Sequence, residues 1–389
     1  MIQTGLIQNA HSDLVTDASY DFYGLRLATC SLDQRIKVWH LDEASGSWSV
    51  KDDWKAHDAP VSKLSWAHPE FGSIIASSSF DRSVKVWEQS LPSGQSESSQ
   101  QTSGSGIGGT SAQPQPSTSR WIERAVLTDA RGTVRAVEFA PHHFGLKLAT
   151  IASDNSLRIY ECIEQPSIST WQLSEELDVQ NLSSSGSPSL HTHGGWCISW
   201  CKDRYWGELI ATASGIDGVV KIIQLTPSRR PTVILTLDPT PTPQTSSSSH
   251  EGNMPTVEGA VPAPPTFSVT SVSWAPSCGR SYHLIATGSR DGRVRIWRVR
   301  PGEDLDREDD DEEGKWTASV VADFDQHKSA IGRVEWNITG TVLSSTGNDG
   351  RVRLWKATSG SVWRPAGSIG VEQTEESELQ ENKDVDMEV

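Results

Sequence analysis

Residues 57–87 read HDAPVSKLSWAHPEFGSIIASSSFDRSVKVW and contain the pattern that decides the fold. His57 is followed by an apolar stretch that ends in Trp66. A run of small residues then leads to Asp81 and, six positions later, to Trp87. The final letters VKVW alternate apolar and polar residues, which is the period of a half-buried strand. We therefore expect three strands here, with a tight turn at Asp81 between the second and the third.

The same arrangement recurs along the chain, so the sequence is built from repeats. An aspartate is followed six positions later by an aromatic or large apolar residue at Asp33/Trp39, Asp81/Trp87, Asp154/Tyr160, Asp217/Ile223, Asp291/Trp297 and Asp349/Trp355. An aromatic residue precedes each aspartate by 13 to 17 positions, at Tyr20, Trp66, Phe139, Trp200, Trp274 and Trp336. Four units also have an earlier histidine, at His11, His57, His193 and His327. Asp-Gly at three of the turns is a strong signal for a tight hairpin, because both central turn positions favour positive φ.

With six units in one register, the sequence resembles the WD-repeat family, whose fold is an all-β propeller of four-stranded blades. We expect six blades over residues 1–360. In that family a loop histidine, a strand serine or threonine, the turn aspartate and the strand tryptophan form a buried hydrogen-bond chain. The resemblance implies such a network at His11, Ser31, Asp33, Trp39, His57, Ser79, Asp81, Trp87, Asp154, Tyr160, Asp217, Asp291, Trp297, Asp349 and Trp355. Tyr160 and Ile223 replace tryptophan, so the third and fourth networks should be weaker.

Biased inserts separate the repeats. Successive turn aspartates lie 48 to 74 residues apart, whereas a bare propeller repeat has about 40 to 45 residues. The excess lies near residues 90–120, 181–190, 239–266 and 301–314, which are rich in Ser, Gly, Gln, Thr, Pro or acidic residues. We expect mobile loops there and a disordered acidic tail over 361–389. Ser187, Thr226, Thr240 and Thr242 each precede a proline, and their phosphorylation is a hypothesis beside plain loop expansion.

The net charge of −16 is concentrated in two short segments. Residues 302–313 have nine acidic residues and one arginine, and residues 371–389 have eight acidic residues and one lysine. The rest is close to neutral, so direct binding of DNA or RNA is disfavoured. No apolar run approaches the roughly 18 residues of a membrane span, and the first residues lack a secretory signal. Five sparse cysteines fit a reducing compartment.

Three longer stretches carry a narrower resemblance. They are WAHPEFG with SFDR and VWE at 66–88, FAPHHFGLKLAT with RIY at 139–160, and WNITGTVLSSTGNDGRVRLWKA at 336–357. These are similar to the family of small WD-repeat propellers whose members serve the nuclear pore and, in a sibling branch, a vesicle coat. The similarity spans about residues 11–360 and favours the nucleoporin branch.

This resemblance implies an open ring of six blades that a partner completes with a seventh. The implied partner is an α-helical nucleoporin of the Y-shaped pore scaffold. A second implied assembly is the SEA/GATOR-type complex at the vacuole or lysosome, which regulates nutrient signalling to the TOR kinase. An open sheet edge is a place for strand addition. Candidate contact residues come from the first and last units, at Leu14, Val15, Ser19, Ile331, Val334 and Leu354; ordinary blade core is the alternative for each.

Other functions remain as alternatives. One is a propeller of the COPII vesicle coat, and another is a closed propeller that reads peptides, which would need seven blades. A zinc site can be assembled from His191, His193, Cys197 and Cys201, but the spacing differs from common zinc motifs. The glycine-rich run at 103–110 lacks the lysine of a phosphate-binding loop. The periodic aspartates fit turns better than catalysis. We therefore expect no cofactor, no metal and no enzymatic activity.

Overall fold

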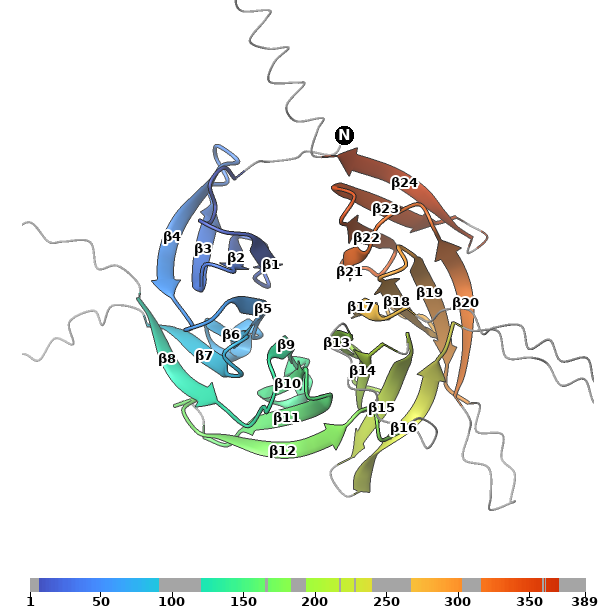
Figure 1. Ribbon diagram of the computed structural model, residues 1–389, viewed down its shortest axis with the longest axis horizontal. Helices are drawn as coiled ribbons and strands as arrows, with labels where there is room; N and C mark the ends of the chain where they lie inside the picture. The colour runs from blue at the N-terminus through green and yellow to red at the C-terminus, as the bar shows by residue number, and fades with distance from the viewer. Residues whose placement is uncertain are drawn as a thin grey trace, which may run out of the picture. The chain divides into compact units, whose positions relative to one another are not determined.

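The computed structural model describes residues 7–90, 120–164, 167–182, 194–216, 218–226, 229–239, 267–302, 316–358, 360 and 362–370. Most of the predicted inserts and residues 371–389 lie outside this part of the chain, as do Asp217, Ser187, Thr240 and Thr242. The regular elements of the described residues are strands and two short 3-10 helices, η1 (Pro69–Phe71) and η2 (His142–Phe144) (Figure 1). None of their helices is long and apolar enough to cross a membrane.

The strands form six sheets, and each sheet is an antiparallel meander of four strands that are consecutive in the sequence. The first sheet joins β1 (Val15–Tyr20), β2 (Arg26–Ser31), β3 (Arg35–Leu41) and β4 (Trp48–Lys55). The second joins β5 (Val61–Trp66), β6 (Ile74–Ser79), β7 (Val84–Ser90) and β8 (Arg120–Leu127). The third joins β9 (Val134–Phe139), β10 (Lys147–Ala152), β11 (Ser156–Cys162) and β12 (Trp171–Asp178).

The remaining three sheets repeat this plan. The fourth joins β13 (Gly195–Trp200), β14 (Glu208–Gly215), β15 (Val220–Thr226) and β16 (Arg229–Leu237). The fifth joins β17 (Val269–Trp274), β18 (His283–Ser289), β19 (Val294–Arg300) and β20 (Thr317–Phe324). The sixth joins β21 (Ile331–Trp336), β22 (Val342–Gly347), β23 (Arg351–Ala357) and β24 (Trp363–Gly370).

The chain divides into two compact units. One contains residues 1–142, 146–148 and 160–173, and the other contains residues 143–145, 149–159 and 174–389. In the first unit, β5 contacts β1 on one side and β9 on the other; in the second, β17 contacts β13 and β21. The sheets therefore pack through their first strands, and the predicted all-β propeller with six blades is confirmed. Openness of the ring stays a prediction.

Burial along a blade follows the position of the strand. β6, the second strand of its blade, is buried at every residue, because both of its faces are covered by neighbouring sheets. The fourth strand, such as β12, alternates half-buried and exposed residues, as expected of an edge with one solvated face. The apolar core consequently lies between the sheets.

The aspartate turns differ in one detail from the prediction. Only the residue after the aspartate has positive φ: Gln34 at 70°, Arg82 at 69° and Gly292 at 81° are examples. The aspartate itself accepts a backbone hydrogen bond from the residue two positions later, as in Arg35 N to Asp33 Oδ1 at 3.0 Å. This side-chain bond holds the turn, so the turn needs one left-handed residue and tolerates glutamine or arginine there.

The last strand corrects the predicted start of the tail. Residues 363–370 form β24, the outer strand of the sixth blade, although the sequence prediction placed them in the acidic tail. Trp363 is buried and packs edge-on against Trp336, with ring centroids 5.3 Å apart. Pro365, which suggests a loop, is tolerated because it lies on an edge strand beside a bulge.

Candidate functional site

The second blade contains a complete hydrogen-bond chain. Trp87 Nε1 donates to Ser77 Oγ at 2.9 Å, and Ser77 Oγ lies 2.8 Å from His57 Nε2. His57 Nδ1 lies 2.8 Å from Asp81 Oδ2. Since the carboxylate can only accept, His57 carries its proton on Nδ1, and Nε2 accepts from the serine hydroxyl. We call this set the tetrad; it joins β6, β7 and two loops of one blade.

The first and sixth blades contain the same tetrad. In the first, Thr29 Oγ1 lies 2.8 Å from His11 Nε2 and accepts from the Trp39 indole at 2.9 Å, while His11 Nδ1 bonds Asp33 at 2.9 Å. The sixth has the equivalent contacts, at 2.8 to 3.2 Å, among His327, Ser345, Asp349 and Trp355.

The bridging hydroxyls are not the predicted ones. Thr29 and Ser77 occupy the places that the sequence prediction gave to Ser31 and Ser79. Residues two apart on a strand point to the same face, so the composition of the strand could not separate them. Ser79 instead accepts from Asp81 N at 3.1 Å and supports the turn; Ser31 does the same in the first blade. A distance of ten residues before the tryptophan identifies the correct hydroxyl and also finds Ser345 and Thr287.

The third blade departs from the tetrad, as its sequence suggested. The hydroxyl of Tyr160 donates to Asp129 at 3.0 Å. Asp154 is held by Arg158, which is buried and also bonds Glu176 at 2.7 Å. An arginine on the aspartate therefore takes the place of a histidine there.

The fourth and fifth blades have partial networks. In the fourth, Ile223 is buried, and the Thr212 hydroxyl has no partner among the described residues; His193 lies outside them. In the fifth, Trp297 Nε1 donates to Thr287 Oγ1 at 3.1 Å, and Arg295 bonds Asp291 at 3.2 Å. Burial of apolar side chains must carry more of the stability in these blades.

The tetrads perturb the acidity of their aspartates. Burial alone would raise the pKa of the Asp81 carboxyl, but hydrogen bonds from His57 and Ser83 outweigh it and hold that pKa well below its usual range. The pKa of Asp33 is lowered in the same way: hydrogen bonds from Arg35 and His11 overcome its burial. These carboxylates are ionised and engaged in structural hydrogen bonds, so they do not offer a general acid.

The residues of the zinc hypothesis are not brought together within the described chain. His191 and His193 lie outside it, and the described residues contain no cluster of three or more histidine, cysteine or acidic side chains. Cys197 and Cys201 are buried free thiols. Burial raises the pKa of Cys201 to about 12, which opposes the thiolate form that zinc requires.

The first strands show where a blade contacts its neighbours. Their first and fourth residues face the preceding blade; Val61, Leu64, Val269 and Val272 are examples, each at most 7% exposed. The second and fifth residues face the following blade. Their half-buried or buried side chains include Ser62, Ser65, Thr270, Ser273 and Ser199.

β1 breaks this pattern on its leading side. Val15 is 49% exposed, whereas its counterparts Val61, Val134 and Ile331 are at most 1% exposed. Leu14 is 72% exposed and Tyr20 is 58% exposed. An apolar strand face that is covered in other blades is uncovered here. We call the exposed residues Leu14, Val15, Ala18 and Tyr20 the leading face.

β21 breaks the pattern on the opposite side. Its second and fifth residues, Gly332 and Glu335, are exposed. In the other first strands the residues at these two positions are buried or half-buried, and Thr16 is the one exception. Arg333 and Glu335 form an ion pair at 3.1 Å. We call Gly332, Arg333 and Glu335 the trailing face.

Of the six predicted contact residues, two lie on the leading face with exposed side chains, Leu14 and Val15. Ser19 is half-buried, and its carbonyl accepts from the Trp66 indole at 2.9 Å. The structure does not place Ile331 and Val334 on an exposed face, because they face the preceding blade and pack around Gly288. Leu354 is half-buried within β23.

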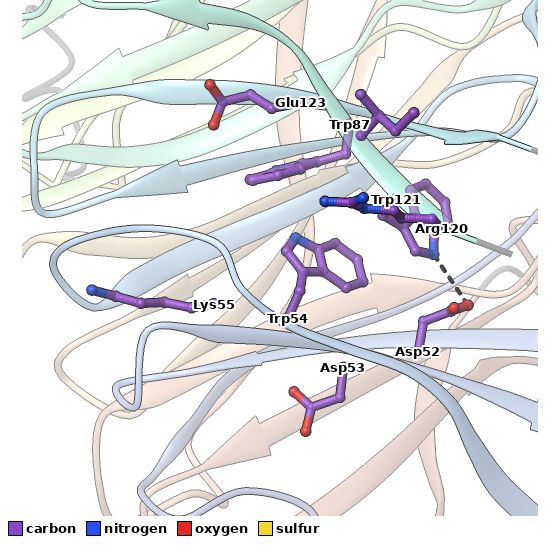
Figure 2. Close-up of a pocket in the computed structure, with 9 residues that line it drawn as sticks. Asp52, Asp53, Trp54, Lys55, Trp87, Arg120, Trp121 and Glu123 are labelled. Carbon is purple, nitrogen blue, oxygen red and sulfur yellow. Dashed lines mark hydrogen bonds between the residues drawn. The ribbon is translucent and has the colours of Figure 1, made fainter. Parts of the chain in front are cut away.

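A pocket of about 700 Å³ lies at the outer edges of β4 and β8 in the first unit (Figure 2). Trp54 stacks on Trp121 with ring centroids 5.4 Å apart, and the Trp121 indole donates to Asp52 at 3.2 Å. Glu123 is paired with Lys85 at 2.9 Å. Residues of β4 in the first blade and of β7 and β8 in the second line it, so the pocket is a joint between two blades rather than part of the candidate site.

The chain is similar to proteins of known families. Residues 3–40, 48–88, 260–298 and 318–356 match the family "WD domain, G-beta repeat". The nucleoporin SEH1 of Saccharomyces cerevisiae is 32% identical over 94% of this chain and 99% of the yeast protein. The Schizosaccharomyces pombe nucleoporin seh1 is 31% identical over 96% and 98%, and human nucleoporin SEH1 is 37% identical over 92% and 86%.

A solved structure shares the fold. It is Chaetomium thermophilum Sqt1 bound to the N-terminus of the ribosomal protein L10, with a TM-score of 0.54 and 17% sequence identity, over 93% of this chain and 76% of that one. At this identity the likeness concerns the fold alone. The nucleoporins are 31% to 37% identical over most of their length, which is enough to show the family. The chain belongs to the family of WD-repeat SEH1 nucleoporins.

Proposed function

We propose that this protein is a non-catalytic scaffold subunit of the nuclear pore, and that it binds its partner by accepting a blade at the leading face of β1. Membership of the SEH1 nucleoporin family supports a role at the pore. The observation that carries the mode of binding is the exposure of Val15. Its counterparts Val61, Val134 and Ile331 are buried against the preceding blade. Exposed apolar strand surface of this kind marks a protein interface.

The order of the strands supports the same proposal. Each described sheet contains four strands that are consecutive in the chain. No described sheet combines a strand from the N-terminal region with one from the C-terminal region, so the described strands do not include the shared sheet that can lock a propeller shut. A strand added by a partner would satisfy the backbone of an uncovered edge. The proposed partner is an α-helical nucleoporin of the Y-shaped scaffold.

The chemistry of the repeat supports a non-catalytic role. The aspartates that recur along the sequence accept hydrogen bonds from turn backbone and from histidine or arginine side chains, as Asp81 and Asp154 do. A catalytic acid would need a singular environment, whereas these are periodic.

The test is affinity purification of the tagged full chain from native extract, followed by mass spectrometry, with Val15→Asp as the matched variant. Wild type should recover Y-complex nucleoporins, and Val15→Asp should lose them while retaining its circular dichroism and melting temperature. Recovery of vesicle-coat proteins alone would mean that the protein is a subunit of the vesicle coat and not of the nuclear pore. Recovery of SEA/GATOR-type subunits beside the nucleoporins would add the proposed second assembly at the vacuole or lysosome. Undiminished recovery with Val15→Asp would overturn the leading face as the binding site.

A further inference from the structure

Neighbouring blades of the first unit are joined by a hydroxyl clamp. The hydroxyl of Thr16, the second residue of β1, donates to the carbonyl of Val61, the first residue of β5, at 2.6 Å. Ser62 of β5 donates in the same way to the Val134 carbonyl of β9 at 2.7 Å. Each clamp bonds a side chain of one blade to the backbone of the next, so it fixes the two first strands relative to one another.

The second unit has the same junctions. Thr270 of β17 donates to the Ile331 carbonyl of β21 at 2.6 Å. Between β13 and β17, the Cys197 thiol lies 3.9 Å from the Val269 carbonyl and serves as a weaker donor. At all four of these junctions, therefore, the carbonyl of the first residue receives a donor from the preceding blade.

Val15 is the counterpart of Val61 and Ile331, and it has no such donor. None of the described side chains donates to its carbonyl, and its own side chain is 49% exposed. The leading face thus presents the acceptor half of a clamp without the donor half.

The sixth blade has no donor of the same kind to offer. Gly332 of β21 occupies the position of Thr16 and Thr270, and it has no side chain. The position has room for one, because an added Cβ would meet nothing closer than Thr346 Oγ1 at 3.5 Å. The trailing face instead offers the charged pair Arg333 and Glu335. A hydroxyl for Val15 must come from outside this chain's described strands.

We propose that the strand which packs on β1 belongs to the partner and carries a serine or threonine whose hydroxyl donates to the Val15 carbonyl. This inference rests on the proposed function, because it names the chemistry of the donated blade. At two of the three hydroxyl clamps an oxygen-bearing residue directly follows the clamp residue, whereas Lys63 follows Ser62. Asp17 and Ser271 hold this position in their strands and accept from Leu64 N at 3.0 Å and Val334 N at 3.1 Å.

The probe is a seventh blade built from the chain itself. A copy of residues 11–56 is fused after Val389 of the full chain, so that its own Thr16 can reach Val15; residues 371–389 act as the linker. In the matched variant this copied threonine becomes valine, which keeps the shape and removes the hydroxyl. A second control changes the copied Ser49, an exposed residue of β4, to alanine.

Hydrogen exchange of the segment 14–20 is the measurement. The fused blade should slow exchange there and raise the melting temperature. The copied Thr16→Val change should make exchange of this segment about 2- to 10-fold faster than with the unchanged copy, which corresponds to the loss of one hydrogen bond. The Ser49→Ala control should leave the exchange rate unchanged. Equal protection by the threonine and valine copies would overturn the clamp while leaving the blade-accepting edge intact. Absence of protection by every fused blade would overturn the edge itself, and with it the proposed function.

A second measurement uses the unfused protein, so the inference does not depend on folding of the copy. Thr270→Val removes an existing clamp and should speed hydrogen exchange of β21 by a similar factor, whereas Thr16→Val should speed exchange of β5. Unchanged exchange in both variants would show that the hydroxyls do not hold the junctions, and the inference for Val15 would fail.

Discussion

β1 and β5 are nearly the same strand in different surroundings. Their sequences, VTDASY and VSKLSW, share the apolar first residue, the hydroxyl second residue and the aromatic last residue. Both blades contain a complete tetrad. Yet Val61 is 0% exposed and Val15 is 49% exposed. The inside of a blade is encoded locally by its own repeat, whereas the state of its face depends on which neighbour is present.

The sharpest test of this comparison places a charge on each face. Val61→Asp buries a carboxylate without a partner and should lower the free energy of unfolding by more than about 4 kcal/mol. Val15→Asp should stay within about 0.5 kcal/mol of wild type, because its side chain reaches solvent. Urea denaturation followed by tryptophan fluorescence measures both. A Val15→Asp protein as unstable as Val61→Asp would mean that the leading face is covered in the free protein.

The tetrads should respond alike in both blades, because they are internal to each. Asp81→Ala and Asp33→Ala should each lower the free energy of unfolding by about 1 to 3 kcal/mol, since each leaves buried donors unpaired. Asp58→Ala is the matched control: its carboxylate is 90% exposed and pairs with Lys55. Thermal melts of the four proteins suffice, and unequal losses for Asp33 and Asp81 would show that the neighbour also affects the blade interior.

The contribution of Asp81 should depend on pH in one direction. Its pKa in the folded protein is held well below the usual 3.8 by His57 and Ser83 against the effect of burial. The stabilisation is therefore present in full above about pH 5, and it is lost as the pH falls through 3.8 toward the folded pKa. The difference in unfolding free energy between wild type and Asp81→Asn should shrink from pH 6 to pH 3. A constant difference across that range would contradict the ionised tetrad.

The smallest expected effect concerns the last residues of the two strands. Trp66→Phe removes the indole donor to the Ser19 carbonyl and should lower stability by about 0.5 to 1.5 kcal/mol. Tyr20→Phe changes a ring that is 58% exposed and should lie within about 0.5 kcal/mol of wild type. If chemical denaturation showed equal losses of stability for Trp66→Phe and Tyr20→Phe, the last residues of β5 and β1 would not differ in their surroundings.

The sequence predicted the blade interiors well, because the turn aspartate and the aromatic residue six positions later recur at a fixed spacing. It misplaced the bridging hydroxyls by two residues, since Thr29 and Ser31 point to the same side of β2. It missed β24, because Pro365 suggests a loop wherever no partner strand is known. It predicted Val15 and Ile331 as equal candidates for partner contact. Their strand patterns are alike, and only the presence of a preceding blade separates 49% exposure from 1%.

The meander of four consecutive strands has a consequence for how the chain is made. Each described sheet pairs only strands that are consecutive in the sequence, and such local topology favours fast folding. A ribosome therefore releases a complete blade before the next one begins, and each new first strand finds its predecessor already in place. Of the six described blades, the first emerges before the others. The exposed face of β1 lies at the starting end of this order of synthesis, and under our proposal the strand that covers it is made by another ribosome.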